Sequence, residues 1–208
     1  MKTLFLAIGS LLFAATTVLA GPPVICHRVD IGNAKSLPWR DVKNWNGAEP
    51  RYDVARLTAD TLALLTAATQ LNVRMETLRR AAIYSVRKDG LADQLTLQLL
   101  ARAANSEAEG KPDAMAWFDA GYFVEGMRQM AFVHRYNMLS REERAQWKLQ
   151  SESRVLDGKP WIDRAVRLGA KGLEIALARV EEYREADLRR TSPAATSTAG
   201  SVTSPSQQ

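Results

Sequence analysis

Residue types that could perform chemistry are sparse in this chain. It holds 1 Cys and 2 His among 208 residues. A single cysteine cannot form an internal disulfide or a multi-thiolate zinc site, and so few histidines leave little for metal or triad chemistry. The sequence also lacks a Gly-x-Ser-x-Gly motif, a glycine-rich phosphate loop and a His-Glu-x-x-His zinc motif. No enzyme class is indicated by a motif, and we expect no cofactor.

Cys26, His27 and Asp30 form the one cluster of potential metal ligands in the sequence. Thiolate, imidazole and carboxylate together suit a soft or borderline metal, and His27 could instead influence the thiol. Adjacent residues do not easily supply two ligands in good geometry. The favoured interpretation is therefore no metal, with Cys26 acting as a small apolar anchor beside an exposed histidine.

Asp119, Glu125 and His134 are the candidate catalytic residues. The two carboxylates lie in an aromatic-rich segment, where burial would raise a carboxyl pKa and suit a general acid. At 100° per residue they are about 120° apart on a helix, so they do not share one face. Because structural ion pairs perturb pKa values too, the favoured interpretation is that both carboxylates pair with arginines or lysines.

Four further residues are candidates for ligand binding. Trp39 and Trp45 could anchor a ligand, or they could cover the end of a helical stack. Arg135 and Tyr136, which follow His134, could bind an anion. The favoured interpretation of that segment is again structural, because a cation at a helix C-terminus is stabilised by the helix dipole.

The first 20 residues predict an export signal. Lys2 is followed by an apolar run, then by Val-Leu-Ala and by Gly21-Pro22-Pro23, which would end a helix at a cleavage site. An uncleaved membrane anchor is the alternative, although no second apolar segment of that kind follows. Removing this segment, whose one charge is Lys2, reduces the formal charge from +5 to +4. That mild, mixed charge argues against a nucleic-acid partner. We expect a periplasmic or secreted protein with no membrane span after cleavage.

The mature chain divides into three parts. Residues 21–52 form an irregular arm rich in proline, whose apolar residues and tryptophans should pack over the body. Residues 53–190 show helical periodicity throughout. Residues 191–208 contain no charge and consist mainly of Ser, Thr, Pro and Ala, which predicts a disordered tail. The expected fold is all-α, either an antiparallel helical bundle or a solenoid-like array of α-hairpins, with about six helices.

Two of the expected helices carry specific predictions. The helix over about 112–135 is apolar around most of its circumference, which is typical of a central helix. The last helix should run for about 28 residues and carry a heptad-like seam over residues 162–183. Gly169 and Gly172 on or beside this seam would let another helix approach, either from the same chain or from a partner or second copy.

These observations favour an exported helical binding or scaffold module whose ligand is unknown, recognised through helical surfaces. The alternative is an enzyme of unrecognised class that uses the carboxylates of the central helix. A pocket joining Asp119, Glu125 and His134 would favour the enzyme, whereas an open groove without them would favour the binding module.

Overall fold

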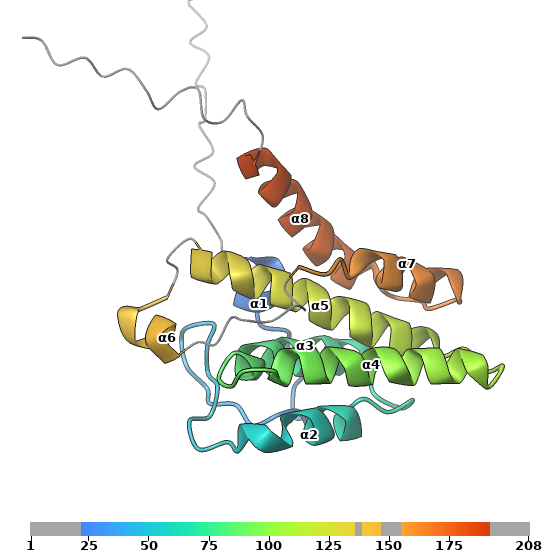
Figure 1. Ribbon diagram of the computed structural model, residues 1–208, viewed down its shortest axis with the longest axis horizontal. Helices are drawn as coiled ribbons and strands as arrows, with labels where there is room; N and C mark the ends of the chain where they lie inside the picture. Colours follow the sequence, from blue (N-terminus) through green and yellow to red (C-terminus); the bar gives the residue numbers. More distant parts are fainter. Residues whose placement is uncertain (1–21, 136–138, 147–154, 192–208) are drawn as a thin grey trace, which may run out of the picture.

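The computed structural model describes residues 22–135, 139–146 and 155–191, and these residues form helices, turns and one isolated bridge, without strands (Figure 1). The elements in chain order are α1 Pro23–Cys26, the 3-10 helix η1 Val54–Arg56, α2 Leu57–Leu64, α3 Leu71–Ser85, α4 Leu91–Ala108, α5 Ala114–Arg135, α6 Arg141–Gln146, α7 Lys159–Arg167 and α8 Glu174–Thr191. The predicted all-α fold is confirmed. The predicted signal lies outside the described residues, as does the predicted tail except for its first residue, which ends α8.

The long helix α5 is the centre of the molecule, as predicted. It contacts α1, α3, α4, α7 and α8, and Figure 1 shows it running between α7 above and α4 below. Phe118 and Tyr122 stack within its core face at a centroid distance of 5.3 Å, and both are fully buried. In a solenoid each hairpin contacts its neighbours only. The helices therefore form a bundle around α5 rather than an open array.

Local sequence signals set the helix boundaries around α4 and α5. Gly90 precedes α4 with φ +77°, a left-handed conformation that favours glycine. Asp113 caps α5, because its Oδ1 accepts the backbone N–H groups of Met115 and Ala116 at 2.9 and 3.1 Å. The Asp113 cap thus sets where α5 begins, next to the α4–α5 loop that forms one end of the candidate site.

The prediction of one continuous helix over the heptad-like seam is wrong. The chain forms two helices, α7 and α8, separated by Gly169 and Gly172, which adopt φ +92° and +73°. Left-handed residues interrupt a right-handed helix, so the axis changes direction (Figure 1). The seam is nevertheless largely buried within the chain, at Ile162, Leu173, Ala176, Val180 and Tyr183.

The N-terminal arm packs over the helical body, as its composition indicates. Val24 and Ile25 of α1 are fully buried and belong to the same core cluster as α5, and Leu37 is buried further along the arm. The Val24 N–H donates to Oε1 of Gln129 in α5 at 2.8 Å. The one helical turn α1 thus anchors an arm that is otherwise irregular. Within the described residues, no helix has the length and apolar character needed to cross a membrane.

Candidate binding pocket between α2 and α4

A pocket of about 590 Å³ opens between α2 and α4, at the junction with the start of α5. Its volume falls within the range of about 300–1,000 Å³ that is usual for ligand pockets. The lining residues come from the end of α2, one side of α4 and the α4–α5 loop: Leu62, Leu65, Gln98, Ala101, Arg102, Asn105, Ser106, Glu109 and Asp113. Two further pockets, of about 270 and 420 Å³, lie against the arm.

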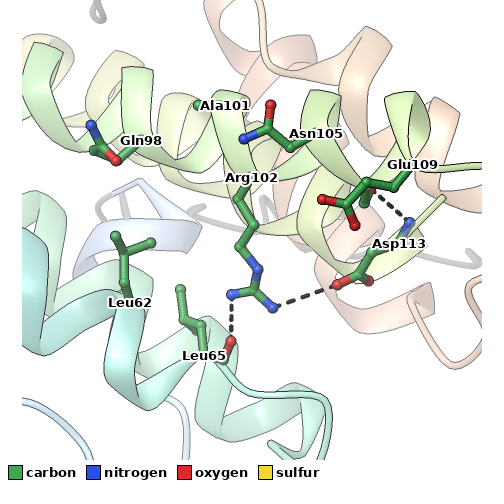
Figure 2. A pocket seen from close by; sticks show the side chains of 9 residues that line it. Leu62, Leu65, Gln98, Ala101, Arg102, Asn105, Glu109 and Asp113 are labelled. Carbon is green, nitrogen blue, oxygen red and sulfur yellow. Dashed lines mark hydrogen bonds and ion pairs between the residues drawn. The ribbon is translucent and has the colours of Figure 1, made fainter. Parts of the chain in front are cut away.

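Arg102 lies in the middle of the pocket between α2 and α4 (Figure 2). Its guanidinium donates to the carbonyl oxygen of Leu65 and lies 3.5 Å from Oδ2 of Asp113. Asp113 is the residue that caps α5, and its own N–H donates to Oγ of Ser106 at 3.0 Å. Arg102 and Asp113 therefore tie the end of α2, the side of α4 and the start of α5 into one wall.

A second ion pair lies behind this wall and is completely buried. Arg74 of α3 donates to Oδ2 of Asp119 in α5 at 2.5 Å, and it also donates to the carbonyl oxygens of Thr66 and Thr69. Oδ1 of Asp119 has no hydrogen-bond partner among the described residues. We call Arg74, Arg102, Asp113 and Asp119 the pocket cluster.

Burial raises the pKa of Asp119 to about 7, although the charge and hydrogen bond of Arg74 oppose the shift. Arg102 also lowers this pKa and Asp113 raises it, which shows that the buried pair is electrostatically coupled to the pocket wall. A carboxyl group with a pKa near neutrality is half-protonated at physiological pH. The pocket is thus backed by a buried group that can change its charge.

The outer side of the pocket presents polar groups that the fold does not use. The side chains of Gln98, Asn105 and Glu109 are exposed and make no hydrogen bond or ion pair with the described residues. Gln98 and Asn105 belong to the solvent-facing side of α4, and Glu109 follows the last residue of this helix. The exposed residues from 94 to 108 carry no charge: Gln94, Leu97, Gln98, Ala101, Ala104, Asn105 and Ala108. Solvent-facing helix sides normally carry charges, so this face is unusual. Its spacing is visible in the sequence, but such residues do not by themselves indicate a ligand site.

Glu125 lies on a different side of α5 and holds the C-terminal helices. Its Oε1 accepts the N–H of Gly158 at 2.9 Å and lies 3.2 Å from Arg184, whereas its Oε2 has no hydrogen-bond partner among the described residues. Burial raises its pKa, opposed first by the charge of Arg128. A Cβ on Gly158 would lie 2.2 Å from the carbonyl oxygen of Gly121, so the absence of a side chain permits this close approach of α7 to α5.

The candidate catalytic residues do not converge. Asp119 faces Arg74 of α3, and Glu125 faces Gly158 on the side of α7 and α8. His134 lies in the last turn of α5. That turn is about 13 Å along the helix axis from Glu125, at about 1.5 Å per residue. The structure therefore does not assemble the three into one site.

Trp39 and Trp45 are both used to hold the arm against α3. The ring of Trp39 lies under the guanidinium groups of Arg79 and Arg80, at 4.8 and 5.3 Å from the ring centroid. The carbonyl oxygen of Trp45 accepts a hydrogen bond from Arg79 at 3.0 Å. Both residues therefore contribute to the contact between the arm and α3.

The same arginines surround the buried carboxylate of Glu76. Its oxygens accept from Arg79, from Arg80 and from the N–H of Val29, at 2.7–3.0 Å. Burial alone would raise the pKa of Glu76, but the hydrogen bond and charge of Arg79, with the other two donors, outweigh burial and lower it. We call Trp39, Glu76, Arg79 and Arg80 the arm cluster.

The potential metal ligands of the arm point to no common site. Cys26 is half-buried at the end of α1, and burial raises the pKa of its thiol to about 11, with the charge of Arg79 in opposition. His27 is exposed, and Asp30 accepts the N–H of Gly32 at 2.8 Å. Among the described residues, no three His, Cys, Asp or Glu side chains are grouped so that they could hold a metal ion.

The anion-binding candidates after α5 are described only in part. Arg135 is exposed at the last position of α5, and Tyr136 lies outside the described residues.

Comparison with known proteins identifies no relative. The chain matches no protein-family model, no curated protein and no solved structure.

Proposed function

We propose that the protein is an exported helical binding module, and that its ligand site is the pocket between α2 and α4. The observation that carries this proposal is the pocket itself. It combines about 590 Å³ of open volume with three side chains, Gln98, Asn105 and Glu109, that have no partner within the described fold. Polar groups that line a pocket and are not engaged by the protein are available to a ligand.

The contacts that surround the pocket support the same proposal. Arg102 connects the end of α2 with Asp113 at the start of α5, and the pocket is open without a ligand. A preformed site avoids the cost of ordering side chains and loops on binding.

The alternative, an enzyme that uses the carboxylates of α5, rests on the raised pKa values of Asp119 and Glu125. These two residues face different neighbours, and Asp119 lies behind the pocket wall with no exposed surface. A general acid must reach the reacting atom directly or through one water molecule. The geometry therefore favours binding over catalysis.

The proposal is tested by blocking the pocket. Ala101 is exposed and lines the pocket, whereas Ala104 is exposed on the same helix and does not line it. A photo-crosslinking residue at position 101 in producing cells should capture a ligand that is identified by mass spectrometry and then purified. Its affinity for the wild-type protein and for the variants Ala101→Trp and Ala104→Trp is measured by calorimetry.

We expect Ala101→Trp to weaken binding by at least about tenfold, because an indole ring would occupy the pocket, and Ala104→Trp to leave affinity within about twofold. Equal affinity of both variants and the wild-type protein would contradict the assignment of the pocket. Catalytic turnover of the captured ligand that is lost in Asp119→Asn, with the fold retained, would favour the enzyme.

A further inference from the structure

We propose that the pocket between α2 and α4 binds an extended polypeptide segment and holds a lysine or arginine side chain of that segment at the carboxylate of Glu109. The ligand site is the one assigned under the proposed function, on which this inference rests. Three properties of the pocket lining support it: the charge at one end, the unused amides along one side and the apolar wall opposite.

The charge of the lining favours a cationic group. Glu109 and Asp113 lie at the same end of the pocket, to one side of Arg102 (Figure 2), and Glu109 has no ion-pair partner among the described residues. Arg102 pairs with the carbonyl oxygen of Leu65 and with Oδ2 of Asp113, whose Oδ1 caps α5. This pair is neutral overall, so Glu109 supplies the unpaired charge of the lining. Lys111 follows in the loop but does not line the pocket.

The amides of α4 suit the backbone of an extended chain. Gln98 and Asn105 each offer a donor and an acceptor on the same side of the helix, and Ala101 between them leaves room for close approach. Gln98 and Glu109 are separated by about 16 Å along the axis at about 1.5 Å per residue, which an extended segment of about five residues spans. A peptide could therefore reach the carboxylate of Glu109 while its backbone pairs with both amides.

The opposite wall selects the neighbouring side chain. Leu62 is half-buried and Leu65 is buried, and both come from the end of α2 (Figure 2). Leu65 is only 1% exposed, so the surface that a ligand could cover is that of Leu62, and covering it with another apolar side chain gains free energy. The favoured segment thus carries an apolar residue close to its basic residue and no acidic residue there.

The direct test uses defined peptides and the purified full chain. Fluorescein-labelled Gly-Ser-Leu-Ser-Lys-Ser is compared by fluorescence anisotropy with the same peptide carrying norleucine or glutamate in place of lysine. We expect the lysine peptide to bind about three- to fivefold more tightly than the norleucine peptide, and the glutamate peptide to bind most weakly. Equal affinity of the lysine and norleucine peptides, or no binding of any of them, would overturn the proposal.

Free cadaverine distinguishes a peptide from a simple amine. It supplies an ammonium group without a backbone or an apolar neighbour, so it should compete only at concentrations well above that of the lysine peptide. Competition at equal concentration would contradict the peptide part of the proposal.

Glu109→Gln tests the residue assigned to the cation. Glu109 is exposed, so the variant should fold normally. We expect it to weaken the lysine peptide by about three- to fivefold, the range of an exposed ion pair, and to leave the norleucine peptide unchanged. Glu182→Gln, which removes an exposed carboxylate of α8, is the matched control and should change neither affinity. An equal loss in both variants would show a general charge effect and count against the site.

Failure of this inference can be separated from failure of the proposed function. If Ala101→Trp abolishes binding of the captured natural ligand while the lysine peptide shows no preference over norleucine, the pocket remains the ligand site but the peptide assignment is wrong. If Ala101→Trp leaves the natural ligand bound, both are wrong.

Discussion

The arm cluster and the pocket cluster both bury charge against α3, on residues of the same helix. In the arm cluster, Glu76 accepts hydrogen bonds from two arginines and one backbone N–H, and its pKa is lowered. In the pocket cluster, Asp119 is paired through one oxygen only, and its pKa is raised to about 7. Similar burial thus produces opposite shifts, because the number of donors decides whether desolvation is offset.

This difference separates a structural cluster from a candidate functional one. Donors to Glu76 come from the arm and from α3, so satisfying the carboxylate also attaches the arm. In the arm cluster both oxygens of Glu76 accept hydrogen bonds, and Nε1 of Trp39 is left without a partner among the described residues. In the pocket cluster it is a carboxylate oxygen of Asp119 that is unpaired, behind the unused polar groups of the pocket. Buried groups that the fold leaves incompletely satisfied are the better candidates for function.

The largest effect should come from breaking the arm cluster with Glu76→Gln. This change leaves the buried guanidinium of Arg79 without its charged partner, and breaking a buried pair in this way costs about 3–5 kcal/mol. Urea denaturation measures the free energy of unfolding. Asp41→Asn, which removes an ion pair whose carboxylate is almost fully exposed, is the control and should cost less than about 0.5 kcal/mol. Equal costs would show that the arm cluster is not structurally important.

The reactivity of the Cys26 thiol measures whether the arm remains packed against the helical body. Because its pKa is raised from 9.0 to about 11, its thiolate fraction at pH 8 should be about 100-fold lower than that of an ordinary thiol. Alkylation by iodoacetamide in the native protein should be slower by about that factor than in urea. Glu76→Gln should accelerate the native reaction by releasing the arm. A native rate equal to that in urea would mean that Cys26 is not shielded.

A smaller effect should appear in the pH dependence of Asp119→Asn. The raised pKa means that protonated Asp119 stabilises the fold fully below its ordinary pKa of 3.8, and that this contribution is lost as pH rises through about 7. The decrease in the free energy of unfolding between pH 5 and 8 should therefore be smaller in the variant, by about 2–3 kcal/mol. Calorimetric unfolding across this range measures it.

The contribution of Glu76 to stability depends on pH in the opposite direction. Because its folded pKa is lowered, its contribution is present above its ordinary pKa of 4.5 and is lost as pH falls through the folded value. Acid unfolding below pH 4.5 should thus be shifted in Glu76→Gln and not in Asp119→Asn. If acid unfolding were shifted in Asp119→Asn and not in Glu76→Gln, the assignment of a lowered pKa to Glu76 and a raised pKa to Asp119 would be wrong.

The smallest effect on stability should come from the pocket surface. Ala101→Trp replaces an exposed residue of α4 and should change the free energy of unfolding by less than about 0.5 kcal/mol. The same denaturation assay measures it. A larger loss would mean that the pocket side of α4 serves the fold, and that a binding defect in this variant could not be assigned to the ligand.

Much of the fold was predictable because its signals are local. The all-round apolar character of residues 112–135 identified the central helix, and Gly90 marked the boundary before α4. The break between α7 and α8 was missed because a heptad-like pattern continues through Gly169 and Gly172, and the pattern does not show that these glycines adopt left-handed conformations. The candidate site was less accessible, since Gln98, Asn105 and Glu109 resemble ordinary surface residues of a helix.

The sequence by itself determined the helical class, the central position of α5, and the types and spacing of its buried carboxylates. Only the tertiary structure decided which donors reach each carboxylate and where a pocket remains open. Helix formation depends on contacts a few residues apart, which the sequence displays directly. The partner of Asp119 lies 45 residues away at Arg74, and the pocket joins α2 to α4. Such contacts depend on how the helices pack, so whether a buried carboxylate finds its hydrogen-bond donors is decided only in the folded chain.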